Sequence, residues 1–110
     1  LCCGEPCTIS WDIINNFAGA FIACSDDYAA SGMRLLGMPQ SCDARIVSGE
    51  SGAVTAGVLA ALMQDPELAQ LRNELGLDKN SRVLLISTEG ATDKVNYLKV
   101  LSGKWKPENK

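Results

Sequence analysis

Two glycine-containing turns carry the side chains most suited to chemistry in this sequence. The residues of interest in them are Glu50, Ser51, Gly52, Ser87, Thr88 and Gly90. Each turn joins a short apolar run to helix-like sequence, which is where an open α/β sheet presents backbone N–H groups and hydroxyls to a ligand. Two such turns within 110 residues predict one ligand site shared between them.

Each turn also has a purely structural interpretation. Ser87 and Thr88 could satisfy backbone groups within their own turn, and the residue chemistry favours neither interpretation. Ser51 could cap a helix that begins near Ala53. Glu50 could be an exposed acid in the first turn of that helix, where the helix dipole favours it.

No complete catalytic set accompanies these turns. The chain has no His, and its cysteines are Cys2, Cys3, Cys7, Cys24 and Cys42. A zinc site would need a second closely spaced pair of ligands after the first three cysteines, so we predict no metal site. An odd, widely spaced set of thiols argues against a disulfide framework and for a reducing, cytoplasmic setting, with the thiols packed as small apolar groups.

Charge and length set further limits. The net charge of −3 gives no support for nucleic-acid binding, which needs a basic face. No apolar run approaches the roughly 20 residues that span a bilayer, so we predict no membrane association. A length of 110 residues fits one domain, and the Leu1 start with cysteines after it suggests a piece of a longer chain.

The sequence alternates helix patterns with short apolar runs. The predicted helices cover about residues 6–18, 26–37, 53–63, 66–75 and 94–101, and the predicted strands cover residues 20–24, 45–48 and 83–86. The helix over 53–63 has no polar face, so we expect it to be buried on most sides. A charge at Val58 should then abolish folding of the segment.

This alternation predicts an α/β fold with a three-layer, open, mostly parallel sheet. Right-handed crossovers would bring both turns to the same edge of that sheet. Three short strands that are apolar on both faces make a thin sheet. We therefore expect further strands from a longer chain or a partner, and without them a large exposed apolar surface or self-association.

Four motifs together resemble the C-terminal part of the diaminopropionate ammonia-lyases. They are CGEPCTI at 3–9, YAASGMR at 28–34, SGESGAV at 48–54 and STEGATD at 87–93. These lyases belong to the pyridoxal-phosphate enzymes of fold type II, with tryptophan synthase β and threonine dehydratase. The resemblance covers essentially the whole chain, and its first and last motifs are specific to the lyases. It implies the C-terminal portion of a fold type II enzyme.

The resemblance also implies a cofactor and a site. The complete enzyme would use pyridoxal phosphate to eliminate ammonia from 2,3-diaminopropionate and form pyruvate. Ser87 would face the pyridine nitrogen of the cofactor, with Thr88 as the alternate and Gly90 in the same turn. The residues implied to border the ring and its pocket are Gly4, Glu5, Glu50, Ser51 and Gly52.

The Schiff-base lysine, the phosphate loop and the proton-abstracting carboxylates of the family have no match here. We therefore predict no catalytic residue in this chain and no activity of the chain alone. The implied partners are the remainder of the enzyme chain, a small amino-acid substrate and a second subunit in a homodimer. The alternative is a free-standing α/β module that binds a ligand or a partner through the same two turns, without catalysis.

Overall fold

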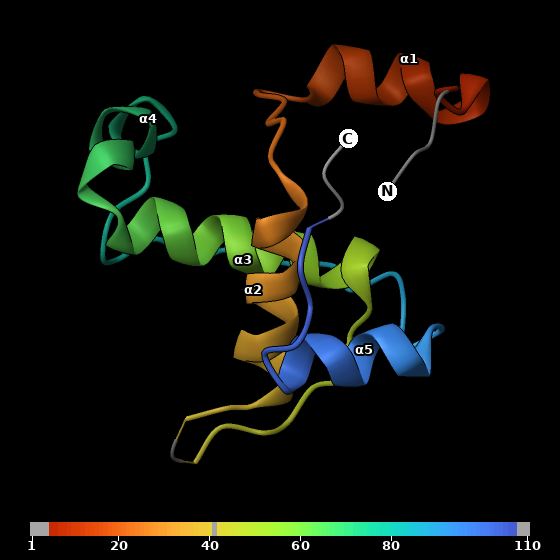
Figure 1. Cartoon of the computed structure of the whole chain (residues 1–110). Coiled ribbons are helices and arrows are strands. Elements are labelled where there is room, and N and C mark those ends of the chain that lie inside the picture. The colour runs from red at the N-terminus through yellow and green to blue at the C-terminus, as the bar shows by residue number, and fades with distance from the viewer. Residues whose placement is uncertain (1–4, 41, 108–110) are drawn as a thin grey trace.

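The computed structural model of the chain describes residues 5–40 and 42–107, and Figure 1 shows how its helices are arranged. The described helices are α1 Thr8–Phe17, α2 Asp26–Gly37, α3 Glu50–Gln64, the 3-10 turn η1 Pro66–Leu68, α4 Ala69–Glu74 and α5 Lys94–Leu101. These elements confirm the five predicted helices, the fourth of which is divided between η1 and α4. None of the described helices has both the length and the apolar character needed to cross a membrane.

Helix α3 begins three residues earlier than predicted. Gly49 occupies the N-cap position with extended backbone, so Glu50, Ser51 and Gly52 form the first helical turn. The suggestion that Ser51 caps this helix is therefore wrong, because Ser51 lies inside it. The sequence missed this start because Gly49 provides a cap without a side-chain oxygen, which is the usual signal.

The centre of the fold is the crossing of α2 and α3. A Cβ atom at Gly32 would overlap the carbonyl oxygen of Ala53, and one at Gly57 would overlap the carbonyl oxygen of Tyr28. Each helix thus lets the backbone of the other approach through a glycine. Both glycines are buried, so this crossing admits no larger residue.

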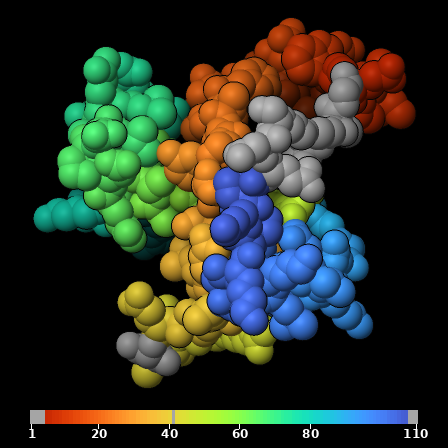
Figure 2. Space-filling view, viewed as in Figure 1, coloured from red at the N-terminus to blue at the C-terminus, as the bar shows by residue number. Residues whose placement is uncertain are grey.

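Helix α5 and the C-terminal segment complete the packed side of α2. The core cluster consists of Ala30, Met33, Ala53, Tyr97 and Val100, with Trp105 packed against it. Arg34 donates from Nη1 to the carbonyl oxygen of Val100 at 3.3 Å, which ties α2 to the end of α5. Figure 2 shows the C-terminal segment lying over α2.

The three predicted strands are not formed by the described residues. Segments 20–24, 45–48 and 83–86 lack the ladder hydrogen bonds that define a strand, so the parallel sheet is not confirmed. A strand needs a neighbour for its N–H and C=O groups, and none of these three segments supplies one to another. Some of their apolar side chains are largely exposed, Phe21 by 68% and Leu84 by 86%.

Helix α3 is also less buried than its composition predicts. One side packs against α2, but Val58 and Leu59 on another side are only half-buried and border an open apolar groove. Helix α1 has no buried residue, although Ile9 and Phe17 are large and apolar. The chain therefore exposes the extensive apolar surface expected of a fold that lacks part of its covering.

Surface area and size support this conclusion. The accessible surface is 8555 Å², whereas a compact monomer of this mass exposes about 5,900 Å². The radius of gyration is 15.0 Å, and a self-contained domain of this length has one of about 13 Å. The chain is more open than a domain that completes its own core.

Candidate functional site

The two glycine-containing turns lie side by side, as the sequence predicts. The backbone N–H of Gly49 donates to the carbonyl oxygen of Glu89 at 3.0 Å. The backbone N–H of Ser51 donates to the Glu89 carboxylate at 3.2 Å. Residue 48 leads directly into α3, and residues 87–90 follow the extended segment 83–86, so tertiary contact joins parts of the chain that are about 40 residues apart in sequence.

Ser87 is part of a hydroxyl pair inside this contact. Its Oγ lies 2.8 Å from the Oγ of Ser48, a side chain with 0% exposure. A Cβ atom at Gly52 would lie 2.5 Å from the Ser48 hydroxyl and 2.6 Å from the Ser87 hydroxyl. Gly52 is therefore required where α3 passes the pair. Ser87 itself remains exposed, so its hydroxyl can still meet a ligand.

Glu89 joins the two turns through its side chain. The hydroxyl of Thr92 donates to one carboxylate oxygen in a short hydrogen bond, and the N–H of Ser51 donates to the other. These hydrogen bonds, chiefly that from Thr92, lower the pKa of Glu89 below its ordinary value. Glu89 therefore stays ionised and holds the start of α3 against the second turn.

Glu50 is held by α5 and does not extend into solvent. The side-chain amide of Asn96 donates to its carboxylate at 2.5 Å, and Glu50 is half-buried. The interpretation of Glu50 as a merely exposed first-turn acid is therefore wrong. Glu50 and Glu89 both border a small cavity of about 80 Å³. Small-molecule pockets start at about 300 Å³, so this cavity is too small to enclose a cofactor.

The structure places the remaining predicted site residues as follows. Thr88 and Gly90 are exposed in the second turn beside Ser87. Glu5 is exposed in the segment that leads into α1, and Figure 1 shows α1 apart from α3 and α5, so the structure does not bring Glu5 to the turns. Gly4 lies outside the described residues.

Two residues of this contact, Ser48 and Glu89, were not predicted as site residues. Ser48 ends a predicted strand and Glu89 stands within the second turn, so their positions at the joined turns were the available signal. The sequence could not reveal their hydrogen-bond partners, because these come from the other turn.

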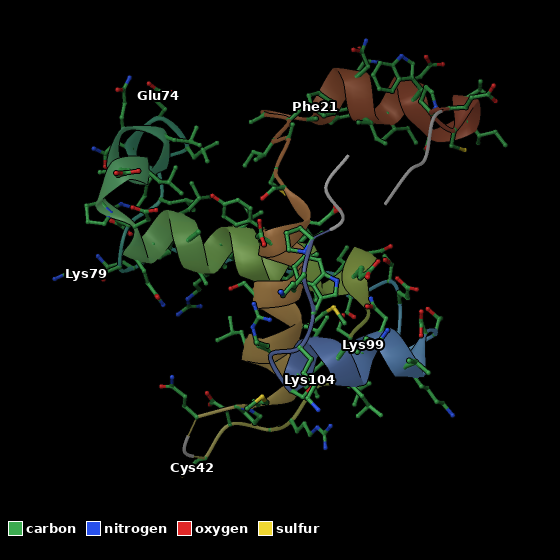
Figure 3. All side chains as sticks on the ribbon, in the orientation of Figure 1. Phe21, Cys42, Glu74, Lys79, Lys99 and Lys104 are labelled. Carbon is green, nitrogen blue, oxygen red and sulfur yellow. The ribbon has the colours of Figure 1, made fainter. Side chains whose placement is uncertain are left out.

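Three exposed thiols lie outside the two turns in the sequence. Cys7, Cys24 and Cys42 are free and exposed, and Figure 3 shows Cys42 at the tip of the loop between α2 and α3. In the part of the chain that the structure describes, no three side chains of His, Cys, Asp or Glu converge on a position for a metal ion.

Comparison with known proteins identifies similar chains. No protein-family model matches the sequence. The chain is 52% identical over 101 residues to the diaminopropionate ammonia-lyase of Escherichia coli K12, a match that covers 92% of this chain and 25% of the lyase. It is 47% identical over 93 residues to the enzyme of the same name from Salmonella typhimurium, covering 84% of this chain and 23% of that enzyme.

Solved structures agree with these relatives. The crystal structure of the E. coli lyase in complex with D-serine matches with a TM-score of 0.86 at 51% identity, over 93% of this chain and 26% of that one. A second structure of the same lyase, in complex with an aminoacrylate-PLP azomethine reaction intermediate, matches with the same TM-score of 0.86. That structure contains the cofactor type that the sequence resemblance implies.

The solved structures that the chain matches are of a pyridoxal-phosphate enzyme of fold type II. Within that class, the resemblance to the diaminopropionate ammonia-lyases is confirmed. The chain spans about a quarter of the length of the curated relatives it matches.

Proposed function

We propose that this chain is the C-terminal, cofactor-site segment of a cytoplasmic pyridoxal-phosphate lyase that eliminates ammonia from 2,3-diaminopropionate to give pyruvate. The observation that carries the proposal is the joined pair of turns, which presents the Ser87 hydroxyl beside a glycine at the start of α3. The 52% identity to a lyase of this name supports the substrate. The segment is inactive alone and works in a homodimer of the complete enzyme.

The residues of the two turns fit one wall of a pyridoxal-phosphate site. Ser87 offers one hydroxyl to the pyridine nitrogen, while Gly49 and Gly52 keep side chains out of the contact between the turns. Thr88 is the alternate to Ser87, and Gly90 leaves the second turn open, with no atom near the position of a Cβ. The bound cofactor supplies the electron sink for the elimination, and the protein supplies orientation and hydrogen bonding.

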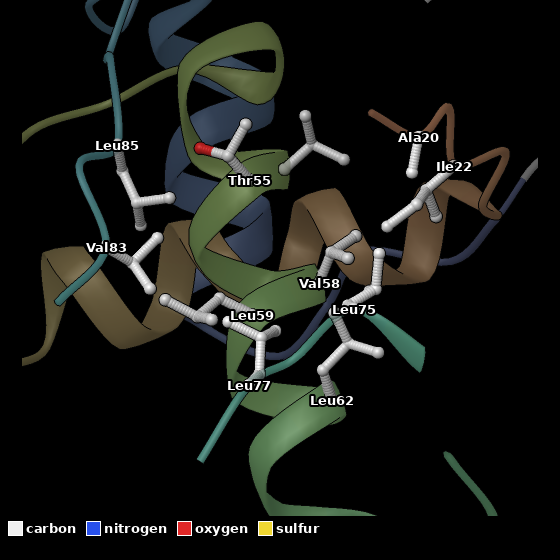
Figure 4. A pocket seen from close by; sticks show the side chains of 11 residues that line it. Ala20, Ile22, Thr55, Val58, Leu59, Leu62, Leu75, Leu77, Val83 and Leu85 are labelled. Atoms are coloured by element: carbon white, nitrogen blue, oxygen red, sulfur yellow. The ribbon is translucent and has the colours of Figure 1, made fainter. Parts of the chain in front are cut away.

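The remainder of the enzyme must then supply the other walls and the missing strands. An apolar groove of about 450 Å³ lies between α3 and the extended segments that contain Ile22 and Val83. Figure 4 shows the side chains that line it. Its lining from α3 includes Val58, Leu59 and Leu62. Strands from the rest of the chain would pair with segments 20–24 and 83–86 and complete the parallel sheet. The accessible surface of the chain is larger than that of a compact monomer of its mass, which argues against a free-standing module.

A complementation experiment tests this proposal. The grafted lyase, in which this chain replaces the matching quarter of the E. coli enzyme, is expected to bind pyridoxal phosphate and to release pyruvate from diaminopropionate. The chain alone, incubated with the cofactor and reduced with borohydride, is expected to carry no stoichiometrically modified lysine. A grafted lyase that folds but binds no cofactor, or lyase activity in the chain alone, would contradict the proposal.

The Ser87 assignment has its own test in the grafted lyase. We expect Ser87→Ala to weaken cofactor binding, because one neutral hydrogen bond contributes about 0.5 to 1.5 kcal/mol. Thr88→Ala, one residue along the same exposed turn, is the matched control. Loss of cofactor affinity in Thr88→Ala but not in Ser87→Ala would move the assignment to Thr88.

A further inference from the structure

Ser48 is a buried hydroxyl that ends next to the proposed cofactor residue. Its exposure is 0%, so it cannot satisfy its hydrogen-bonding capacity with bulk water. A buried hydroxyl without a partner is destabilising, so its proton must point at a protein acceptor. The direction of that proton decides what Ser87 can do.

Three acceptors surround the Ser48 hydroxyl. The Oγ of Ser87 lies at 2.8 Å, whereas the carbonyl oxygens of Gly49 and Glu89 both lie at 3.4 Å. The Glu89 carbonyl already accepts the N–H of Gly49 at 3.0 Å. Hydroxyl hydrogen bonds are strongest near 2.7 to 2.8 Å, so the contact with Ser87 is the strongest of the three, and either serine can be its donor.

Each hydroxyl has a single proton, so the Ser87 proton is free when Ser48 is the donor of the pair. Its acceptor within the turn is the Glu89 carbonyl at 3.5 Å, a long contact. A ligand nitrogen with an open lone pair would bind that proton better. If Ser87 instead donated to Ser48, Ser87 could only accept, and a ring nitrogen facing it would have to carry a proton.

We propose that Ser48 is a positioning residue of the cofactor site, which donates to Ser87 and thereby makes Ser87 a hydrogen-bond donor to an unprotonated pyridine nitrogen. This inference rests on the proposed function. Gly52 enforces the geometry, because its missing side chain is what lets both hydroxyls lie against α3.

The test uses the grafted lyase loaded with pyridoxal phosphate that is labelled with nitrogen-15 in the ring. The informative variants are Ser48→Ala, Ser87→Ala and the double variant, since alanine fills nearly the same buried volume as serine. Ser102→Ala is the matched control, because Ser102 is an exposed serine whose hydroxyl donates to a backbone carbonyl. Solid-state nitrogen NMR reports the ring nitrogen, and equilibrium dialysis gives the cofactor Kd.

We expect Ser48→Ala to shift the ring-nitrogen resonance from its wild-type position, with the shifted resonance still in the range of an unprotonated pyridine. We also expect it to raise the cofactor Kd about three- to tenfold. The double variant should match Ser87→Ala, because Ser48 acts through Ser87. Ser102→Ala should leave both readouts unchanged. A resonance that stays at its wild-type position in Ser48→Ala, or effects of the two substitutions that add, would overturn the inference.

A second variant covers the case in which Ser48→Ala does not fold. Gly52→Ala keeps both hydroxyls but places a methyl group against them, and we expect it to shift the same resonance. An unchanged resonance in a folded Gly52→Ala enzyme would also overturn the inference. Failure of the proposed function has a different result, because the wild-type grafted lyase would then bind no cofactor. If only the Ser48 inference fails, the wild-type enzyme still binds the cofactor and Ser87→Ala still weakens that binding.

Discussion

The packed region and the open region of this chain differ in how far their polar groups are hydrogen-bonded and their apolar side chains are buried. The packed region consists of α2, α3, α5 and the two turns, where the core side chains pack together, Gly32, Gly52 and Gly57 meet close neighbours, and the Ser48 and Ser87 hydroxyls pair. The open region consists of α1, segments 20–24 and 83–86, and the groove side of α3. There, large apolar side chains such as Phe17 and Leu84 are more than four-fifths exposed.

This contrast separates the part of the candidate site that is held by contacts within the chain from the part that needs other segments. The joined turns are held by hydrogen bonds between residues of this chain, namely the contact of Ser48 with Ser87 and that of Ser51 with Glu89. The expected parallel sheet needs strands that the described residues do not form. Substitutions in the two regions should therefore respond differently to the presence of the rest of the enzyme.

The largest expected effect is in the open region. In the grafted lyase, Val58→Asp should destabilise the enzyme by about 3 to 5 kcal/mol, because the filled groove would bury an unpaired charge. In the chain alone Val58 is half-buried beside an open groove, so the substitution should cost about 1 kcal/mol or less. This replaces the sequence-based expectation that the charge abolishes folding of the segment. Denaturation followed by circular dichroism measures both values.

Asn73→Asp is the control for Val58→Asp, since Asn73 is exposed on α4. It should change stability by less than about 0.5 kcal/mol in both settings. Equal costs of Val58→Asp with and without the rest of the enzyme would show that nothing covers the groove, and the contrast between the two regions would disappear.

The next effect is in the packed region. Gly57→Val should destabilise both the chain alone and the grafted lyase by about 3 kcal/mol, because any Cβ there overlaps the Tyr28 carbonyl where α2 and α3 cross. Gly19→Val is the control, since no atom lies within 4 Å of a Cβ at Gly19. Thermal unfolding midpoints compare the two. If Gly57→Val unfolds at the same temperature as Gly19→Val, the helices do not cross at these glycines.

The smallest effect concerns Glu89 and pH. Its pKa is lowered in the folded chain by the Thr92 hydroxyl and then by Ser51, so the ionised form stabilises the fold above the ordinary pKa of 4.5. That stabilisation is lost as the pH falls through the lowered pKa. We expect Glu89→Gln to unfold at a lower temperature than the wild type at pH 7, with the difference vanishing under acid conditions. A difference that stays constant down to pH 2 would show that the carboxylate charge is not involved.

The sequence predicted the helices well because their signals are local. Asp93 illustrates this, since its side chain accepts the N–H of Asn96 as an N-cap should. The predicted strands failed for the opposite reason. An apolar run such as 83–86 indicates what would pair in a sheet, but pairing requires a neighbour that no local pattern supplies.

The site divides in the same way. The sequence by itself determined that Ser87, Thr88 and Gly90 form a polar turn, and the motifs around it determined the resemblance to the lyases. Only the tertiary structure decided that Ser48 bonds to Ser87 and that Glu89 binds the start of α3. Those contacts join residues about 40 positions apart, and hydrogen-bond partners at that separation are set by how distant segments pack together, not by local propensity.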